Sequence, residues 1–278
     1  AMQVGGRLEH SDINDQLLFA PRFSSAYKLN ENSQVSLAYG QFYQQAPKNV
    51  LLKTSNVEEQ QSNHYILNYQ VNKNKRLLRV EPYYKNYKNL ISYKSDFSEI
   101  GNQGKAYAYG LDVFYKDWRT IKNAQFWVSY SYLNTERKYK DYPEQVIPTF
   151  ASKHSLSVVY KHWVSDLKSM ISISVRYSTP RTFNDPNQSK FNDSRTEPFR
   201  TLDLSWSFLP KKHIIFYTAI TNVLGFENKF GSRFSSQADS NGTYAQSDIL
   251  PSAKRFIFIG CFLTFTKKGT ANQLNTLN

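Results

Sequence analysis

Apolar and polar residues alternate with a period of two along most of the chain. Between Met170 and Ser178, isoleucine, valine and tyrosine occupy every second position, and serine and arginine occupy the positions between them. The segment from Arg200 to Phe208 repeats the pattern, with leucine and aromatic residues set against threonine, aspartate and serine. A helix would repeat its apolar positions every ~3.6 residues, so the pattern predicts β-strands with one apolar and one polar face.

The alternation predicts about twelve strands. They are expected at residues 2–10, 17–29, 34–45, 61–72, 76–93, 104–118, 124–138, 153–164, 167–180, 199–209, 213–225 and 252–266. Several are longer than the ~5–6 residues usual in soluble proteins, and they reach the ~9–11 residues that cross a bilayer at a tilt. This length favours membrane strands over a soluble sandwich.

Short and long connections alternate from the second strand to the last. Short turns are expected at residues 30–33, 72–75, 119–123, 165–166 and 210–212, and long polar loops at 46–60, 94–103, 139–152, 181–198 and 226–251. Outer-membrane barrels combine tight periplasmic turns with long extracellular loops in this way. The sequence therefore predicts an all-β, transmembrane, antiparallel up-and-down β-barrel in a bacterial outer membrane, in contact with the lipid bilayer.

In such a barrel the apolar positions face lipid and the polar positions face the lumen. We expect a lipid-facing set and a lumen-facing set on two of the strands. The lipid-facing set is Ile171, Ile173, Val175, Leu202, Leu204 and Trp206, and the lumen-facing set is Ser172, Ser174, Thr201, Asp203 and Ser205. The charged lumen residues are expected to pair across neighbouring strands; they are Arg79, Glu81, Asp112, Arg176 and Asp203.

Composition changes this interpretation little. The 278 residues carry a formal net charge of +13, but lysine and arginine are spread along the chain, so no nucleic-acid partner is predicted. No apolar stretch approaches the ~18 residues of a spanning helix. The single cysteine, Cys261, excludes an internal disulfide framework and a multi-cysteine zinc site within this chain.

Enzymatic chemistry is not predicted. The five histidines lack metal-ligand spacing, so no metal or other cofactor is expected. His154 beside Ser155 invites comparison with an outer-membrane phospholipase, which needs its base and nucleophile on one side of the wall. Adjacent strand residues point to opposite faces, so this pair is wrongly disposed.

Several segments carry family motifs in a consistent order. They are Ala20–Leu29 with Gln34–Gln44, His64–Tyr69 with Arg79–Lys85, Gly104–Asp112, Thr221–Gly225 and Gly260–Phe265. Together they resemble the barrel of TonB-dependent receptors, particularly those of Bacteroidetes. Gly260, Leu263 and Phe265 match the signal that the barrel-assembly machinery reads in outer-membrane proteins. Phe258 departs from the pattern, which has a polar residue at this position.

The resemblance implies a fold and a function. Family barrels have twenty-two strands preceded by a plug, so the chain is expected to be the C-terminal part of such a barrel. Residues 1–265 would form strands and extracellular loops, and residues 266–278 a polar tail. The implied function is TonB-energised uptake of a bulky nutrient (siderophore, cobamide, glycan or peptide), with the plug and the TonB-contacting segment outside this chain.

Ligand contact in a receptor is expected from aromatic residues of the long loops. The candidates are Tyr142, Phe183, Phe191, Phe230, Phe234 and Tyr244. Rings of this kind stack on sugars or aromatic chelators, but they can equally pack loop against loop. The alternative to a receptor is a self-contained twelve-stranded barrel that acts as a passive pore, an adhesin or a structural protein. The receptor hypothesis predicts a plug and ten more strands encoded upstream; the alternative predicts a signal peptide directly before Ala1.

Overall fold

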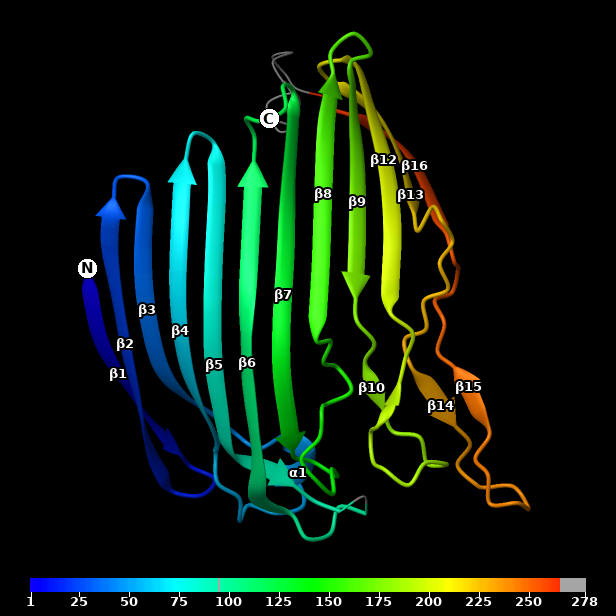
Figure 1. Cartoon of the computed structure of the whole chain (residues 1–278). Coiled ribbons are helices and arrows are strands. Elements are labelled where there is room, and N and C mark those ends of the chain that lie inside the picture. Colours follow the sequence, from blue (N-terminus) through cyan, green and yellow to red (C-terminus); the bar gives the residue numbers. More distant parts are fainter. Residues whose placement is uncertain (95, 266–278) are drawn as a thin grey trace.

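Twelve long strands form one antiparallel sheet in the computed structural model, which describes residues 1–94 and 96–265 (Figure 1). Each long strand pairs with the next long strand along the chain. They are β1 (Met2–Ser11), β2 (Gln16–Asn30), β3 (Ser33–Gln44), β4 (Gln60–Lys73), β5 (Arg76–Ser92), β6 (Gly101–Asp117), β7 (Ala124–Lys138), β8 (His154–Val164), β9 (Ser169–Ser178), β12 (Phe199–Lys211), β13 (Ile214–Thr221) and β16 (Phe256–Leu263). The predicted fold class and strand order are confirmed.

Two strands near the C-terminus are shorter than predicted. The strand expected at 213–225 ends at Thr221, because Asn222 adopts a positive φ of 49° and its side chain donates to the carbonyls of Phe226 and Lys254. The strand expected at 252–266 runs only from Phe256 to Leu263, because β13 offers no partner beyond the Thr221–Phe256 pair. The predicted tail, 266–278, lies outside the described residues.

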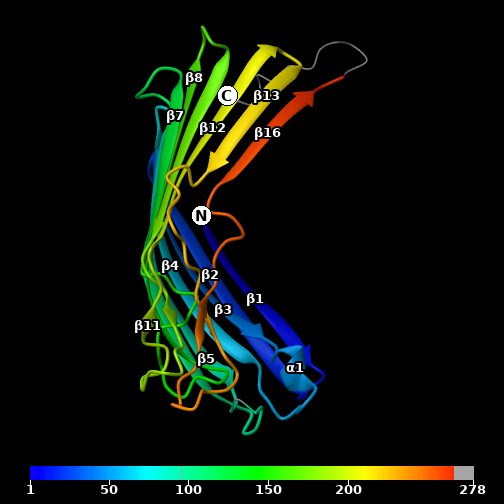
Figure 2. The ribbon, with the colours of Figure 1, turned by 90° about the vertical axis from the view of Figure 1, so that its right-hand side faces the viewer.

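The sheet curves into a trough that is open along one side (Figure 2). Its concave face is polar on β9 and β12, where Ser172, Ser174, Asp203 and Ser205 line a hollow of about 590 Å³. The convex face carries the apolar positions, and Ile171 and Trp206 are 40% and 43% exposed there. Apolar and polar side chains are therefore sorted to the two faces as predicted.

The prediction that lumen charges pair across strands is correct for one pair only. Arg176 donates to Asp203 at 2.8 Å, a diagonal contact between β9 and β12. Glu81 and Asp112 stand directly opposite each other in the β5–β6 register, so they cannot form an ion pair. Each carboxylate instead accepts a neutral donor, Asn68 for Glu81 at 2.8 Å and Ser131 for Asp112.

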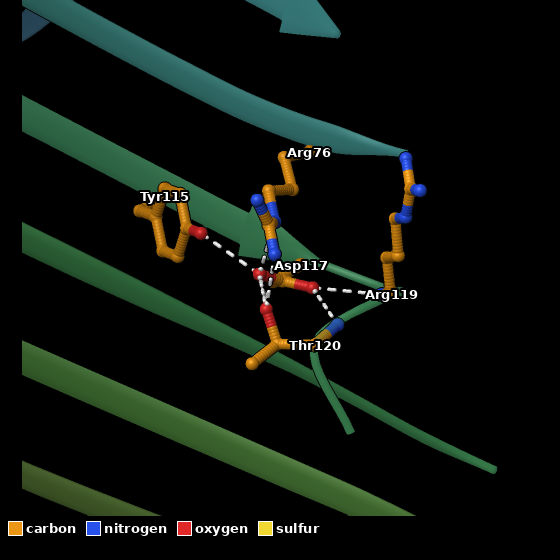
Figure 3. Close-up of polar contacts among 5 residues, drawn as sticks. All are labelled: Arg76, Tyr115, Asp117, Arg119 and Thr120. Atoms are coloured by element: carbon orange, nitrogen blue, oxygen red, sulfur yellow. Dashed lines mark hydrogen bonds and ion pairs between the residues drawn. The ribbon is translucent and has the colours of Figure 1, made fainter. Parts of the chain in front are cut away.

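A buried aspartate organises one of the tight turns, the one after β6 (Figure 3). Asp117 is 1% exposed, and its Oδ1 accepts the backbone N–H groups of Arg119 at 2.7 Å and Thr120 at 2.8 Å. Its Oδ2 accepts the Arg76 Nε–H at 2.9 Å and the hydroxyls of Tyr115 at 2.8 Å and Thr120 at 2.6 Å. These bonds join the start of β5 to the end of β6 and fix the return of the chain.

The two edges of the trough are β1 and β16. Among the described residues these two strands do not pair with each other, and each has a partner on one side only. An unpaired strand edge leaves backbone N–H and C=O groups unsatisfied, which in hydrocarbon costs several kcal/mol per group. The trough therefore needs further strands before it can stand alone in a bilayer.

Candidate ligand-binding site

All the long connections lie at one end of the sheet (Figure 1). They hold more secondary structure than the polar loops expected from the sequence: helix α1 (Lys48–Leu51), the hairpin of β10 (Thr182–Phe183) with β11 (Ser194–Arg195), and the hairpin of β14 (Ser232–Phe234) with β15 (Gln246–Asp248). The long-loop end is thus a folded layer set on the rim of the trough.

The first long loop has a small apolar core of its own. Val50 of α1 is fully buried and packs with Ala46, Val57 and Ile91. Asn102 anchors the same loop, because its Oδ1 accepts the Glu58 N–H at 2.8 Å and its Nδ2 donates to the Glu58 carbonyl at 2.9 Å. The loop is therefore fixed to the ends of β5 and β6.

The candidate aromatic residues of the other loops contact one another or their neighbours. The Phe183 ring stacks on Phe234 with centroids 6.3 Å apart, and the Tyr142 ring lies edge-on to Phe191 at 5.0 Å. Phe230 lies 6.2 Å from Phe199 at the start of β12. Each contact joins two segments, so these rings hold the loops together, and each of them keeps part of its surface exposed.

The sixth candidate, Tyr244, is held by its backbone. Its N–H donates to Asn187 Oδ1 at 2.8 Å, and its carbonyl accepts from Asn187 Nδ2 at 3.0 Å. Asn187 belongs to the loop that carries β10 and β11, so the last two long loops are joined here. The structure pairs Phe183 with Phe234 and Tyr142 with Phe191. The two pairs adjoin because Thr182, next to Phe183, accepts a hydrogen bond from Asn192, next to Phe191, at 3.1 Å.

A row of cationic and aromatic side chains runs along the concave face next to the loops, and the sequence patterns did not reveal it. The Arg22 guanidinium lies 4.9 Å from the centre of the Phe42 ring, and Phe42 lies 4.8 Å from His64. His64 is 6.2 Å from Tyr87, and Arg137 lies 4.9 Å from the centre of the Tyr87 ring. We call these five residues the cationic–aromatic row.

The row carries unneutralised positive charge. Within residues 1–94 and 96–265, neither Arg22 nor Arg137 has a carboxylate in ion-pair distance. Arg137 is surrounded by rings instead, with Tyr139 at 5.6 Å and Phe150 at 5.0 Å as well as Tyr87. Burial, and then the neighbouring Tyr142, raises the pKa of Tyr139 to about 12.

A hollow of about 510 Å³ opens beside Arg22, Phe42 and His64 and is also lined by Arg7. Cations over aromatic faces attract planar anionic groups, since the ring stacks while the guanidinium supplies charge and hydrogen bonds. The row could have been found only from strand register, because its members lie on β2, β3, β4, β5 and β7. Arg22 faces Gly40 and Gly40 faces His64, which aligns the residues on one face.

Metal and hydrolytic chemistry find no support in the geometry. Among the residues that the structure describes, no three histidine, cysteine or acidic side chains converge on a metal site. His154 and Ser155 point to opposite faces: His154 Nδ1 lies 2.8 Å from the Tyr130 hydroxyl, and Ser155 Oγ lies 3.2 Å from Ser178 Oγ. No described helix is long and apolar enough to cross a membrane.

A curved antiparallel sheet with an apolar convex face, a polar concave face and all long loops at one end defines the wall of an outer-membrane β-barrel. A family model described as "TonB dependent receptor-like, beta-barrel" matches residues 2–223. The chain belongs to this family of outer-membrane transport barrels. A comparison with curated proteins gave no match.

Solved structures agree on the fold. A mutant of the ferric enterobactin receptor PfeA from Pseudomonas aeruginosa, in complex with enterobactin, has a TM-score of 0.73 at 14% identity over 95% of this chain and 43% of its own. The outer membrane transporter YddB from Escherichia coli has a TM-score of 0.71 at 12% identity over 95% and 43%. The ferric-catecholate import receptor Fiu from E. coli K12 has 0.65 at 13% identity over 90% and 35%. The chain thus spans about two fifths or less of their length, and it forms an antiparallel sheet that matches part of a twenty-two-stranded barrel.

Proposed function

We propose that the chain forms the C-terminal part of the barrel of a receptor that imports a bulky nutrient with energy from TonB. Further strands would complete the barrel between β1 and β16, and a plug would fill the lumen. The long loops would face the outside of the cell. Two finer points rest on sequence resemblance alone: a Bacteroidetes-type receptor, and insertion by the barrel-assembly machinery through Gly260, Leu263 and the 87% exposed Phe265.

The observation that carries this proposal is the cationic–aromatic row on the concave face. A passive pore needs no aromatic rings beneath guanidinium groups that lack a carboxylate partner, and an adhesin would place them outside the lumen. Arg22 and Arg137 favour an anionic ligand, and Phe42 and Tyr87 favour a planar one. Of the nutrients considered, an iron-loaded aromatic siderophore fits best, and PfeA and Fiu are named for ferric enterobactin and ferric-catecholate import. The loop rings Tyr142, Phe183, Phe191, Phe230, Phe234 and Tyr244 would form the outer part of the same site.

Uptake of radiolabelled ferric enterobactin by cells that express the complete receptor tests the proposal. A hydrogen bond to a charged group contributes about 1.5–3 kcal/mol, so R22Q/R137Q should weaken binding about 10-fold or more. The matched control is Arg79→Gln, another concave-face arginine, which lies against Phe114 at 5.9 Å and outside the row. Uptake should stop when TonB is deleted. Uptake that persists without TonB would favour the passive pore, and equal binding by both variants would remove the row from the site.

A further inference from the structure

Three lysines stand side by side on the convex face at the long-loop end. Lys105 of β6 is directly opposite Lys138 of β7 in the strand register. Lys88 of β5 pairs with Gln61 of β4 and so lies on the convex face, and it directly follows Tyr87, which pairs with Ala106 just before the β5–β6 register shifts. Lys88 therefore lies next to Lys105. Directly opposite side chains in a sheet have Cβ atoms about 4.5–5.5 Å apart, and like charges at this spacing are destabilising. We call Lys88, Lys105 and Lys138 the lysine ladder.

No carboxylate of the described residues lies within ion-pair distance of the ladder. Two carboxylates lie nearby. Glu58 accepts the side-chain amide of Asn89, next to Lys88, at 2.8 Å, and Glu136 lies two residues before Lys138 on the same face. Its carboxylate accepts the side-chain amide of Gln145 at 3.2 Å. The ladder therefore concentrates positive charge on three adjacent strands without a counter-ion from the part of the chain that the structure describes.

The ladder lies just beyond the apolar band of the wall. On β6 the convex positions read Tyr107, Tyr109, Leu111, Val113 and Tyr115, and Lys105 comes next toward the loops. Residues 107–115 span about 27 Å along the strand, or roughly 19 Å across a bilayer at a 45° tilt, which takes up most of the ~25 Å band of outer-membrane barrels. Lys105 thus lies at the level where lipid headgroups begin.

The opposite end of the same strands is arranged differently. There the convex-face Arg76 is neutralised within the chain by Asp117 at 2.9 Å. On β5, β6 and β7 the convex-face cations without an ion-pair partner among the described residues are thus the three ladder lysines, at the end that the proposed orientation places in the outer leaflet. At the tight-turn end the adjacent strand β4 carries a single exposed lysine, Lys73.

A hollow of about 730 Å³ adjoins the ladder on the loop side. Gln103 of β6 and Lys138 of β7 line it together with residues of the loop before β6 and of the loop after β7. Its charged lining balances only when Lys138 of the ladder is included: Lys94, Lys138 and Lys140 against Asp96, Glu99 and Asp141. Ladder and hollow together carry five lysines against three acids, and a polar, net cationic surface of this size suits a sugar that carries phosphate groups better than a simple phospholipid headgroup.

We propose that the lysine ladder binds the phosphate groups of a phosphorylated glycolipid in the outer leaflet, with its sugar over the adjacent hollow. The acyl chains would then lie along the apolar band below, beside Tyr107 and Leu111. This site is on the outer surface of the wall, away from the cationic–aromatic row, so it is independent of which nutrient the receptor imports. It depends only on the long loops facing outward.

Native mass spectrometry of the complete protein in neutral detergent tests the proposal. The probes are bis-phosphorylated lipid A, its dephosphorylated form and inorganic phosphate. Each lysine near an anionic lipid surface contributes roughly a fivefold gain in binding, so K105Q/K138Q should lower lipid A affinity by about 10- to 30-fold. Arginine at both positions should restore binding. The matched control is K73Q/K122Q, which removes two exposed lysines at the tight-turn end and should leave binding unchanged.

Three results would overturn the proposal. They are equal binding of the dephosphorylated lipid, an equal loss in the control variant, and full competition by millimolar inorganic phosphate, which would indicate a site for free anions. The difference in gel mobility between heated and unheated samples establishes that each variant is a folded barrel. If K105Q/K138Q does not fold, the single variants K105Q and K138Q are measured in its place. Each is expected to lower the affinity for lipid A about fivefold.

Discussion

Arginine in place of Ile173 tests the two-faced sheet most directly. Ile173 lies on the convex face of β9 and is 36% exposed, flanked in register by Tyr160 on β8 and Leu204 on β12. It is four residues from Ser169 and five from Ser178, or about 13 and 17 Å along the strand. At a 45° tilt these lengths become roughly 9 and 12 Å, which places Ile173 near the middle of a ~25 Å band.

The cost of I173R follows from this depth. Arginine on the lipid face near the midplane of a barrel costs about 2–4 kcal/mol. Ser174 is the matched control, because it is the next residue on β9, faces the concave side and has Asp203 directly opposite in register. S174R should cost less than about 1 kcal/mol, since its guanidinium reaches water and a carboxylate.

Urea titration of the complete protein folded into lipid vesicles measures both variants. The midpoint should fall clearly for I173R and little for S174R. Equal losses for the two would refute the assignment of faces. A larger loss for S174R would mean that the concave side is packed against a plug so closely that the added side chain cannot be accommodated.

Three further predictions follow from the same structure. Asp117→Ala should destabilise the protein by about 2–4 kcal/mol in the same titration, because it removes five hydrogen bonds, whereas D117N should recover part of the loss; an unchanged midpoint would contradict the role of this carboxylate. External protease on intact cells should cut within 226–251 and spare the turn at 72–75, and the reverse pattern would invert the topology. Oxidation of V4C should give no intrachain disulfide with Cys261, because β1 and β16 are opposite edges of the sheet; rapid crosslinking would mean that the twelve strands close on themselves.

The long strands could be predicted because burial on one face imposes a period of two that no other structure shares. The predicted strands 213–225 and 252–266 were too long, because contacts that alternation does not report decide where these strands stop and start. Thr221 and Asn222 continue a strand-like composition, but the Asn222 side chain caps the end of β13 and turns the chain. The start of β16 at Phe256 then follows from where its partner β13 ends, which is a tertiary property and cannot be deduced from alternation within residues 252–266.

The loop structure could not be predicted for a different reason. The β10–β11 hairpin has only two residue pairs, too few to show a period. It is held by contacts distant in sequence: Thr182 Oγ1 donates to the Ile147 carbonyl at 2.9 Å, and Asn192 Nδ2 donates to the same carbonyl. Such contacts exist only once β7, β8 and β9 have brought the loops together.

The cationic–aromatic row and the lysine ladder share a further property. Within its own strand each residue looks ordinary, because single charged or aromatic residues are common toward the ends of barrel strands. Both groups become visible only when registers are followed across strands: from Arg22 through Gly40 to His64 on one face, and from Lys88 through Lys105 to Lys138 on the other. In a sheet of this kind a binding surface is a line across strands, so its chemistry is fixed by pairing rather than by any local motif. A one-residue slip between β6 and β7 would move Lys138 to the concave face and place Arg137 toward lipid, which would dismantle both groups at once.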